Sequence, residues 1–283
     1  MNIKNNINRF WASIACKISP TFYLNLSYFH NRGRLPNLKN PTNLSEFIIS
    51  KIVSGKINDY AQLADKYAVR SFVAEKGLSH ILTKLYGHWD KVYQINFDEL
   101  PDQFVLKCNF GCGMNVICFD KGQLDFQEVK SQLNSWMEIT KFAVAEPHYS
   151  KIEKCIIGEE LIKDEYFDLP TDYKFMCING EPHHILVVSE REGHSYKLYT
   201  YSLNWEKLDL LKDIYKHDKN IPKPKNLEKM IDYACILSTE FDFVRVDLYD
   251  TGDKVFFGEM TFTPHGGLLR YYTTEALQEI WKR

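Results

Sequence analysis

The sequence lacks the features that mark a membrane-spanning or a generally nucleic-acid-binding protein. No stretch of the 283 residues approaches the roughly 18 uninterrupted apolar residues of a spanning helix. The 35 basic and 37 acidic residues give a formal net charge of −2, which argues against a general nucleic-acid surface. The moderately apolar stretch 10–16 is short and is followed by Lys17, so we expect no signal peptide.

The cysteines also lack a recognisable pattern. There are seven of them, an odd number, and no Cys-x-x-Cys occurs. Cys108, Cys112 and Cys118 lie close together in sequence, but no nearby pair of histidines completes a zinc site. The others are scattered through apolar stretches. We therefore expect reduced thiols that act as small hydrophobic residues in the cytoplasm.

What the chain does contain is typical of an ordinary globular protein. Hydrophobic residues make up 45% and charged residues 25%, and the 18 Phe, 17 Tyr and 5 Trp can supply a sizeable core. The length favours about two domains, or two lobes of one enzyme.

The first 45 residues contain no acidic residue, and Glu46 is the first of the chain. The rest has 29 basic and 37 acidic residues, a formal charge of −8. Two interpretations stay open: a helical hairpin whose aromatic residues pack on the body, or a segment that contacts an anionic membrane surface. The basic residues are Lys4, Arg9, Lys17, Arg32, Arg34 and Lys39, interleaved with Phe10, Trp11, Phe22, Tyr23, Tyr28 and Phe29.

Hydrophobic periodicity predicts helices first and then antiparallel hairpins with helices between them, which indicates an α+β fold. Asn179-Gly180 is a strong signal for a tight hairpin turn. The predicted helices cover residues 65–76, 126–139 and 227–239, and another starts near Ser45. The predicted strands cover residues 81–86, 104–109, 114–119, 155–161, 173–178, 183–189, 241–249 and 254–260.

A lysine and a glycine-rich loop form the first candidate site. Lys107 lies in the middle of an apolar strand, where an unpaired buried charge would be costly, so its ammonium must face an anion or solvent. The following loop contains Asn109, Gly111, Cys112 and Gly113, and its glycines would let backbone N–H groups approach phosphate oxygens. An edge strand with a solvent-facing lysine and a glycine turn would look the same.

Two late strands form the second candidate site. Arg245 and Asp247 share one face of the first strand, and Glu259 and Thr261 share one face of the next. Two carboxylates and a hydroxyl are hard-oxygen ligands of the kind that Mg²⁺ prefers. The alternative is that Arg245 simply forms ion pairs with one or both acids.

The turn between these strands decides whether the acids meet. A two-residue turn that pairs Asp250 with Asp253 would place Asp247 and Glu259 on opposite faces, whereas a three-residue loop would place them on one face. A metal site here therefore predicts an odd-numbered loop or a β-bulge.

The third candidate is the strand around residues 156–162, which ends in Glu159, Glu160 and Leu161. Such a strand end can present backbone groups to an adenine edge, although taken alone it is more often merely a strand end.

The order of these motifs resembles the ATP-grasp proteins, and more narrowly their TupA-like branch, which occurs in bacterial cell-surface polysaccharide gene clusters. The resemblance runs from about residue 65 to about residue 268. The segments that carry it are Asp65-Lys66-x-x-x-Arg70, residues 100–107, residues 109–113, Asp172-Tyr173-Lys174, Arg245-Val246-Asp247 and residues 258–264.

The resemblance implies two α+β lobes that clamp ATP, preceded by a helical N-terminal segment. The implied domains are residues 1–80, a small lobe at 81–160 and a large lobe at 161–283 that carries the metal site. It implies phosphate contacts from Lys66 and Lys107, a lid formed by the glycine loop, and stabilisation of the transferred phosphoryl by Arg245. It also implies an adenine-binding hinge at Glu159, Glu160 and Leu161, ribose or phosphate contacts from Asp172 or Lys174, and Mg²⁺ bound by Asp247, Glu259 and Thr261.

The sequence departs from the family at two places. Many ATP-grasp enzymes have Glu-x-Asn where this chain has Glu259-Met260-Thr261, which puts the metal role of Thr261 in doubt. Phe110 and Cys112 also replace residues often found in the loop, which leaves the loop's contacts open.

The activity that the resemblance implies is ATP- and Mg²⁺-dependent joining of a carboxylate to an amine through an acyl phosphate. The implied substrates are an amino acid or other amine and a uronic-acid-type carboxylate in surface glycan assembly. A glycan kinase, a glycosyltransferase and a non-catalytic nucleotide-binding protein are the alternatives. The sequence leaves the oligomeric state open, and the enzyme is expected in the cytoplasm, with a peripheral membrane contact through residues 1–45 as the open alternative.

Overall fold

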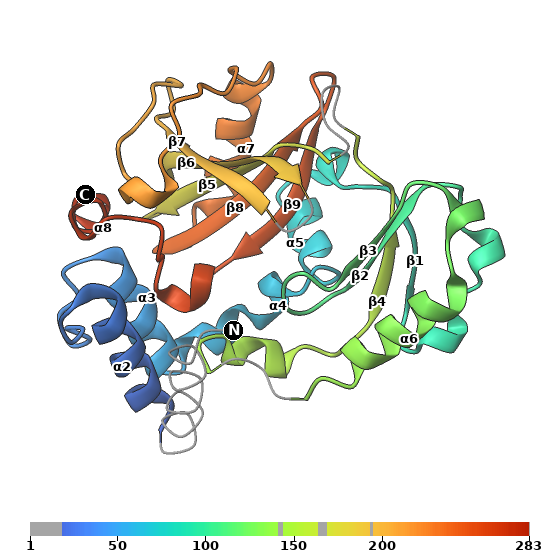
Figure 1. Ribbon diagram of the computed structural model, residues 1–283, viewed down its shortest axis with the longest axis horizontal. Helices are drawn as coiled ribbons and strands as arrows, with labels where there is room; N and C mark the ends of the chain where they lie inside the picture. The colour runs from blue at the N-terminus through green and yellow to red at the C-terminus, as the bar shows by residue number, and fades with distance from the viewer. Residues whose placement is uncertain (1–18, 141–143, 164–168, 193–194, 283) are drawn as a thin grey trace.

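Two antiparallel sheets face each other across the molecule, with helices around them, in a computed structural model (Figure 1). The structure describes residues 19–140, 144–163, 169–192 and 195–282. Within these residues no helix is long and apolar enough to cross a membrane. The α+β class expected from the sequence is confirmed.

The smaller sheet has four strands in the order β1-β4-β2-β3. Its core lies on the side covered by α6 (Phe126–Met137), where Phe104 and Leu106 pack with Val129 and Leu133. Asp125 caps this helix by accepting hydrogen bonds from the N–H groups of its first turn. The strands are β1 (Leu85–Trp89), β2 (Phe104–Cys108), β3 (Asn115–Cys118) and β4 (Ile156–Glu159).

The larger sheet has five strands in the order β7-β6-β5-β8-β9. Helix α7 (Leu227–Ser238) packs on β5, β6 and β8 and buries Met230, Ala234 and Leu237 in the main core. Asn179 and Gly180 both have positive φ, 51° and 83°, as the predicted tight hairpin turn requires. The strands are β5 (Asp172–Ile178), β6 (Glu181–Glu192), β7 (Ser195–Tyr201), β8 (Phe243–Asp250) and β9 (Val255–Thr261).

The helical segment before the sheets packs against the larger sheet and its C-terminal helix. Glu46 is buried near the start of α3 and is paired with Arg34 at 2.6 Å, and burial of its helix adds Ile48 and Ile49 to the core. The helices are α2 (Pro20–Arg32), α3 (Leu44–Val53), α4 (Ala61–Ala64), α5 (Val69–Glu75) and α8 (Thr274–Trp281). Single 3₁₀ turns are η1 (Lys56–Tyr60), η2 (Ser79–Ile81), η3 (Val92–Gln94), η4 (Phe97–Glu99), η5 (Lys121–Gln123), η6 (Pro147–Lys151), η7 (Asp213–Tyr215) and η8 (Pro264–Gly267).

The structure differs from the predicted elements in several places. The helix predicted at 65–76 begins only at Val69. The residues before it form a turn, because the Asp65 carboxylate accepts hydrogen bonds from the N–H groups of Tyr67 and Ala68. The strand predicted at 81–86 lies further on, at Leu85–Trp89. Strand β7 and helix α8 were not predicted, and both complete the larger lobe's core.

Two buried histidines make the fold sensitive to acid. Burial lowers the pKa of His148 to about 4, and burial, with the charge of His183 next to it, holds the pKa of His184 well below its usual range. The unfolded chain takes up these protons near pH 6.5, whereas the folded chain does not. Stability from both groups is therefore present above about pH 6.5 and is lost as the pH falls.

We expect the two histidines to lower the free energy of unfolding between pH 7 and pH 5, by up to about 1.4 kcal/mol per pH unit for each of them. His148→Gln should flatten this slope, and His80→Gln, at an exposed position, should leave it unchanged. Urea denaturation at pH 7, 6 and 5 measures the slope. An identical slope in the parent and the His148 variant would contradict the assignment.

Candidate functional site

A β-bulge in the β8–β9 hairpin places the two candidate metal ligands opposite each other. Leu248 pairs with Phe257, but the next pair is Asp247 with Glu259, so Gly258 is the extra residue. The loop itself pairs Asp250 with Val255, a register that without the bulge would put the two acids on opposite faces. The structure thus contains the bulge that a shared acidic site requires.

Only a glycine fits at the bulge. A Cβ at Gly258 would lie 3.0 Å from the backbone oxygen of Asp247 and 2.9 Å from the ring of Tyr249. The bulge also places Tyr249 and Phe256, which pair with each other, on the same face as the two acids.

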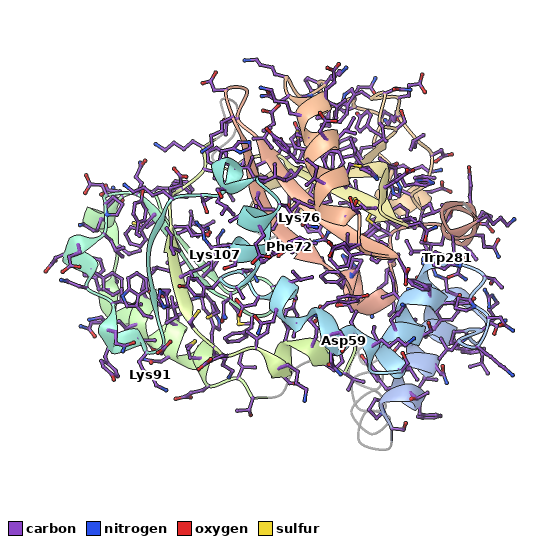
Figure 2. All side chains as sticks on the ribbon, turned by 180° about the vertical axis from the view of Figure 1, so that it is seen from behind. Asp59, Phe72, Lys76, Lys91, Lys107 and Trp281 are labelled. Atoms are coloured by element: carbon purple, nitrogen blue, oxygen red, sulfur yellow. The ribbon has the colours of Figure 1, made fainter. Side chains whose placement is uncertain are left out.

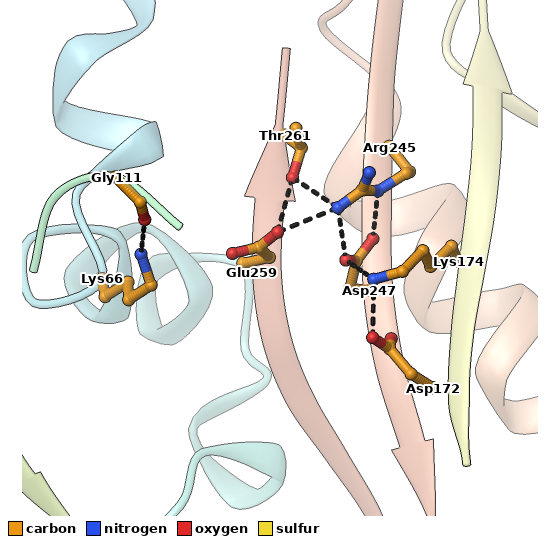
Figure 3. Close-up of polar contacts among 8 residues, drawn as sticks. All are labelled: Lys66, Gly111, Asp172, Lys174, Arg245, Asp247, Glu259 and Thr261. Atoms are coloured by element: carbon orange, nitrogen blue, oxygen red, sulfur yellow. Dashed lines mark hydrogen bonds and ion pairs between the residues drawn. The ribbon is translucent and has the colours of Figure 1, made fainter. Parts of the chain in front are cut away.

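Arg245 links both acids on this face (Figure 3). Its Nε and Nη2 donate to the two oxygens of Asp247 at 2.7 Å, and Nη2 also donates to Glu259 Oε1 and Thr261 Oγ1, each at 2.9 Å. The Thr261 hydroxyl donates in turn to Glu259 Oε1 at 2.8 Å. The ion pairs that the sequence left open as an alternative are therefore present.

Lys174 adds a second cation from the neighbouring strand. Its register partner is Asp247, and its ammonium lies 2.5 Å from Asp247 Oδ2 and 2.6 Å from Asp172 Oδ2. Five charged residues from β5, β8 and β9 thus form one network, which we call the acidic cluster: Asp172, Lys174, Arg245, Asp247 and Glu259.

The pKa values of two carboxylates in the cluster are shifted in opposite directions. Burial would raise the pKa of Glu259, but the cations of Lys66, Arg245 and Lys174 lower it to about 2. Burial, with the nearby negative charges of Asp172 and Glu259, raises the pKa of Asp247 to about 6 in spite of Arg245 and Lys174. Glu259 is therefore an anion at every physiological pH.

Lys66 lies across from this cluster, next to the glycine loop (Figure 3). Its ammonium donates to the carbonyl oxygen of Gly111 at 2.6 Å, in the glycine loop. Figure 3 shows the second oxygen of Glu259 directed toward Lys66, and among the described residues no hydrogen bond to that oxygen is found. The glycine loop and the acidic cluster thus face each other with a lysine and a carboxylate oxygen between them.

Two glycines of the glycine loop lie in the left-handed region of backbone conformation. Gly111 and Gly113 have positive φ, 67° and 73°, and the Cys112 side chain between them is exposed. A Cβ at Gly111 would lie 2.3 Å from the Met114 side chain, so the chain packs closely there. Successive N–H groups in such a loop can face an anion.

Asn109 holds the base of this loop. Its amide nitrogen donates to Asp65 Oδ2 and to the Glu153 carbonyl at 2.9 Å, and its oxygen accepts from the Cys155 N–H at 2.8 Å. The side chain is buried and fully engaged within the fold. Asn109 would therefore contribute to nucleotide binding indirectly, by holding the glycine loop in place.

Lys107 lies on the side of the small sheet that faces the large sheet (Figure 2). Its ammonium forms an ion pair with Glu159 Oε2 at 2.8 Å, and Arg70 pairs with Glu159 Oε1 at 2.9 Å. Glu159 is 5% exposed, and these two cations lower its pKa against the effect of burial. Lys107 thus belongs to the small lobe's own charge network and not to the acidic cluster.

A cavity of about 520 Å³ lies where the chain leaves the small sheet. Glu160 and Leu161 line it on one side, and Phe256 from the β8–β9 hairpin lines it on the other. The Glu160 carboxylate accepts a hydrogen bond from the Lys84 N–H at 2.6 Å, which fixes the exit of β4. The remaining lining residues are Ile162, Lys163, Lys225, Thr251 and Asp253.

The predicted site residues thus form three groups along one side of the two sheets. Arg70, Phe256 and Lys225 were not assigned a role from the sequence. Arg70 belongs to the segment Asp65-Lys66-x-x-x-Arg70, which carries the family resemblance, whereas the other two lie outside these segments. The groups are Glu160 and Leu161 at the cavity, Lys66, Lys107, Glu159 and the loop 109–113 on the small-lobe side, and Asp172, Lys174, Arg245, Asp247, Glu259 and Thr261 in the large sheet.

The donor set of the acidic cluster fits Mg²⁺ in kind. Glu259 has one oxygen that accepts no hydrogen bond from a described residue, and the Thr261 hydroxyl lies beside it. Both oxygens of Asp247 accept from Arg245 or Lys174, so Asp247 would have to exchange some of these contacts to bind a metal. Within the described part of the chain, no three His, Cys, Asp or Glu side chains form a metal-binding group. A cation here would therefore take the rest of its ligands from phosphate and water, as Mg²⁺ commonly does.

Comparison with known proteins gives one family. Residues 46–280 match the family model described as TupA-like ATPgrasp. A comparison with the curated proteins finds no match.

Several solved structures resemble the chain at low identity. They include a D-alanine–D-alanine ligase from Bacillus anthracis complexed with ATP (16% identity, TM-score 0.43, 77% of this chain and 56% of that chain). They also include the ATP-grasp ligase PsnB complexed with a minimal precursor (10% identity, TM-score 0.38, 70% and 52%). A third is D-cycloserine synthetase DcsG (11% identity, TM-score 0.43, 77% and 68%). The chain thus spans little more than half the length of the first two.

Gly258→Ala tests the bulge. The added methyl group would press on the Asp247 backbone, and we expect a loss of about 1–3 kcal/mol in unfolding free energy together with a displaced Glu259. Thermal unfolding and Mg²⁺-dependent ATP binding measure the two effects. Gly122→Ala is the control, since its Cβ would meet only the Asp120 side chain, at 3.2 Å. Unchanged stability and ATP binding in the Gly258 variant would rule out this role for the glycine.

Proposed function

Because the chain belongs to the TupA-like ATP-grasp family, we propose that it is an ATP- and Mg²⁺-dependent ligase that joins a carboxylate to an amine. The observation that carries the proposal is the bulge at Gly258, which turns Asp247 and Glu259 to one face, opposite Lys66 and the glycine loop. A lysine held by the glycine loop and an acidic pair across from it are complementary to a metal-bound triphosphate.

The three groups of residues suggest how ATP lies. The cavity beside Glu160, Leu161 and Phe256 has room for a base, and it is continuous in sequence with Glu159, the partner of Lys107. The triphosphate would extend from there past Lys107 toward Lys66 and the glycine loop. Its terminal phosphate would then lie next to Glu259.

The reaction that we propose has two steps. An oxygen of the substrate carboxylate attacks the γ-phosphorus of ATP, and the bond to ADP breaks, which leaves an acyl phosphate. The amine then attacks the acyl carbon, phosphate leaves, and the amine loses a proton. Mg²⁺ would neutralise phosphate charge when bound.

The protein contributes position and charge in both steps. Lys66 and Lys107 would bind phosphate oxygens, and their cations favour the charge that builds up during transfer. Arg245 is held by Asp247 and Glu259, so its guanidinium keeps a fixed orientation without rearrangement at the moment of reaction. Nε and Nη2 of Arg245 make its hydrogen bonds to Asp247, Glu259 and Thr261, and we propose that Nη1 contacts the transferred phosphoryl group.

The substrates belong to the same proposal. We infer an amino acid or another amine as the nucleophile and a uronic-acid-type carboxylate as the acceptor of the phosphoryl group, in cell-surface polysaccharide assembly. This substrate class derives from the family resemblance. We also propose a cytoplasmic location, with which the six free cysteines of the described residues agree.

Lys107→Met should weaken ATP binding about tenfold to a hundredfold, because a charge-assisted contact to phosphate contributes about 1.5–3 kcal/mol. The fold should persist, since Arg70 still neutralises the buried Glu159. Calorimetric titration with ATP and Mg²⁺ measures the affinity. Lys91→Met, at an exposed position of the small lobe away from the large one, is the matched control (Figure 2). Equal affinity in both variants would remove Lys107 from the site.

Hydroxylamine distinguishes a ligase from a kinase. With ATP, Mg²⁺ and a panel of uronic and amino acids, a ligase should release ADP and form a hydroxamate, and Glu259→Gln should abolish both. ADP release with phosphorylated product and no hydroxamate would instead indicate a kinase. Binding of uridine or cytidine nucleotides without any ADP release would indicate a glycosyltransferase.

A further inference from the structure

Helix α2 exposes an apolar stripe. Phe22, Leu26 and Phe29 lie four and three residues apart, on one side of the helix, and are 49%, 41% and 48% exposed. The opposite side is buried through Leu24 and Tyr28, which are in the main core. Leu35, three residues after the helix, is 65% exposed. The sequence left open whether the aromatic residues of this segment pack on the body, and the structure divides them: Tyr23 and Tyr28 do, whereas Phe22 and Phe29 do not. Phe10 and Trp11 lie outside the described residues.

The sequence segment that contains this stripe has basic residues and no acidic ones. The 45 residues that include α2 contain six basic residues and no acidic residue, although the remaining chain has an excess of eight negative charges. Within the described residues, Arg32 and Arg34 are engaged by the fold and Lys39 is exposed. Lys4, Arg9 and Lys17 precede the helix in sequence, together with Phe10 and Trp11.

We propose that α2 docks on an anionic lipid surface, with Phe22, Leu26 and Phe29 in the headgroup region. An aromatic and leucine stripe within a purely basic segment is complementary to such a surface. A second copy of the chain fits less well, because a symmetric contact through this face would bring the two basic segments together. The contact would be reversible and dependent on lipid charge, since three half-exposed side chains bury little apolar area.

The fold would transmit this docking to the candidate active site. Arg32, at the end of α2, donates three hydrogen bonds of 2.8–3.0 Å to the carbonyl oxygens of Leu268, Leu269 and Tyr272. Ser45 at the start of α3 donates to Leu268 as well, at 3.0 Å. In the chain, this segment follows the turn η8, which in turn follows β9, the strand that carries Glu259 and Thr261. If the proposed function holds, docking would fix the large-lobe end of the cleft near the membrane, where a lipid-linked glycan is available.

Vesicle sedimentation tests the docking without knowledge of the substrates. We expect the full chain to bind vesicles of phosphatidylcholine with about one-third phosphatidylglycerol, to bind pure phosphatidylcholine far less, and to dissociate in high salt. Phe22→Ser with Phe29→Ser should reduce partitioning at least about tenfold. Lys39→Gln should reduce it about fivefold.

Tyr93→Ser is the matched control, since Tyr93 is an 82% exposed aromatic residue of the small lobe. All variants should keep the parental melting temperature and ATP affinity, so that failure of docking is separate from failure of the proposed function. Absence of binding to anionic vesicles, or equal binding by the double-serine variant, overturns the proposal. A dimer in sedimentation equilibrium that the double-serine variant loses would assign the stripe to a second copy instead, and would overturn it too.

Discussion

The register shift at Gly258 is the constraint on which the candidate site depends. Without it, the pairing set by the hairpin loop would point Asp247 and Glu259 to opposite faces of the sheet, one of them into the apolar core. The bulge leaves Gly258 without a register partner between β8 and β9. It gains a common face on which Arg245 contacts both carboxylates.

That common face also explains why so many charges are tolerated at low exposure. Asp247 and Arg245 are 1% and 7% exposed, and an isolated charge at either position would be strongly unfavourable. Each is instead paired within a network that spans three strands. Such a network is a poor source of net stability but a good source of fixed orientation. A preorganised guanidinium is what a phosphoryl-transfer site requires.

In the small sheet, a buried charge is likewise paired within its own network. Glu159 is buried between Lys107 and Arg70, so the lysine is oriented toward the cleft side of its strand before any ligand binds. Lys66 is oriented by the carbonyl oxygen of Gly111. The two lobes therefore carry independent charge networks, and they approach each other through Lys66 and the open oxygen of Glu259.

Local pattern was enough to predict most strands, the α6 and α7 helices, the Asn179-Gly180 turn and the fold class, because alternation and turn chemistry act over a few neighbouring residues. It was also enough to select the charged residues that lie in otherwise apolar strands, such as Lys107 and Asp247. Local signals were also present for α8, which has Thr273 as its N-cap and buries Ala276, Leu277 and Ile280 on one face, so this helix could have been predicted. Local pattern could not decide between a metal site and ion pairs, nor assign a role to Phe256. Those depend on register and on contacts between distant segments: the bulge at Gly258, the pairing of Lys107 with Glu159 and the exposure of Phe22 and Phe29 exist only once the chain is packed.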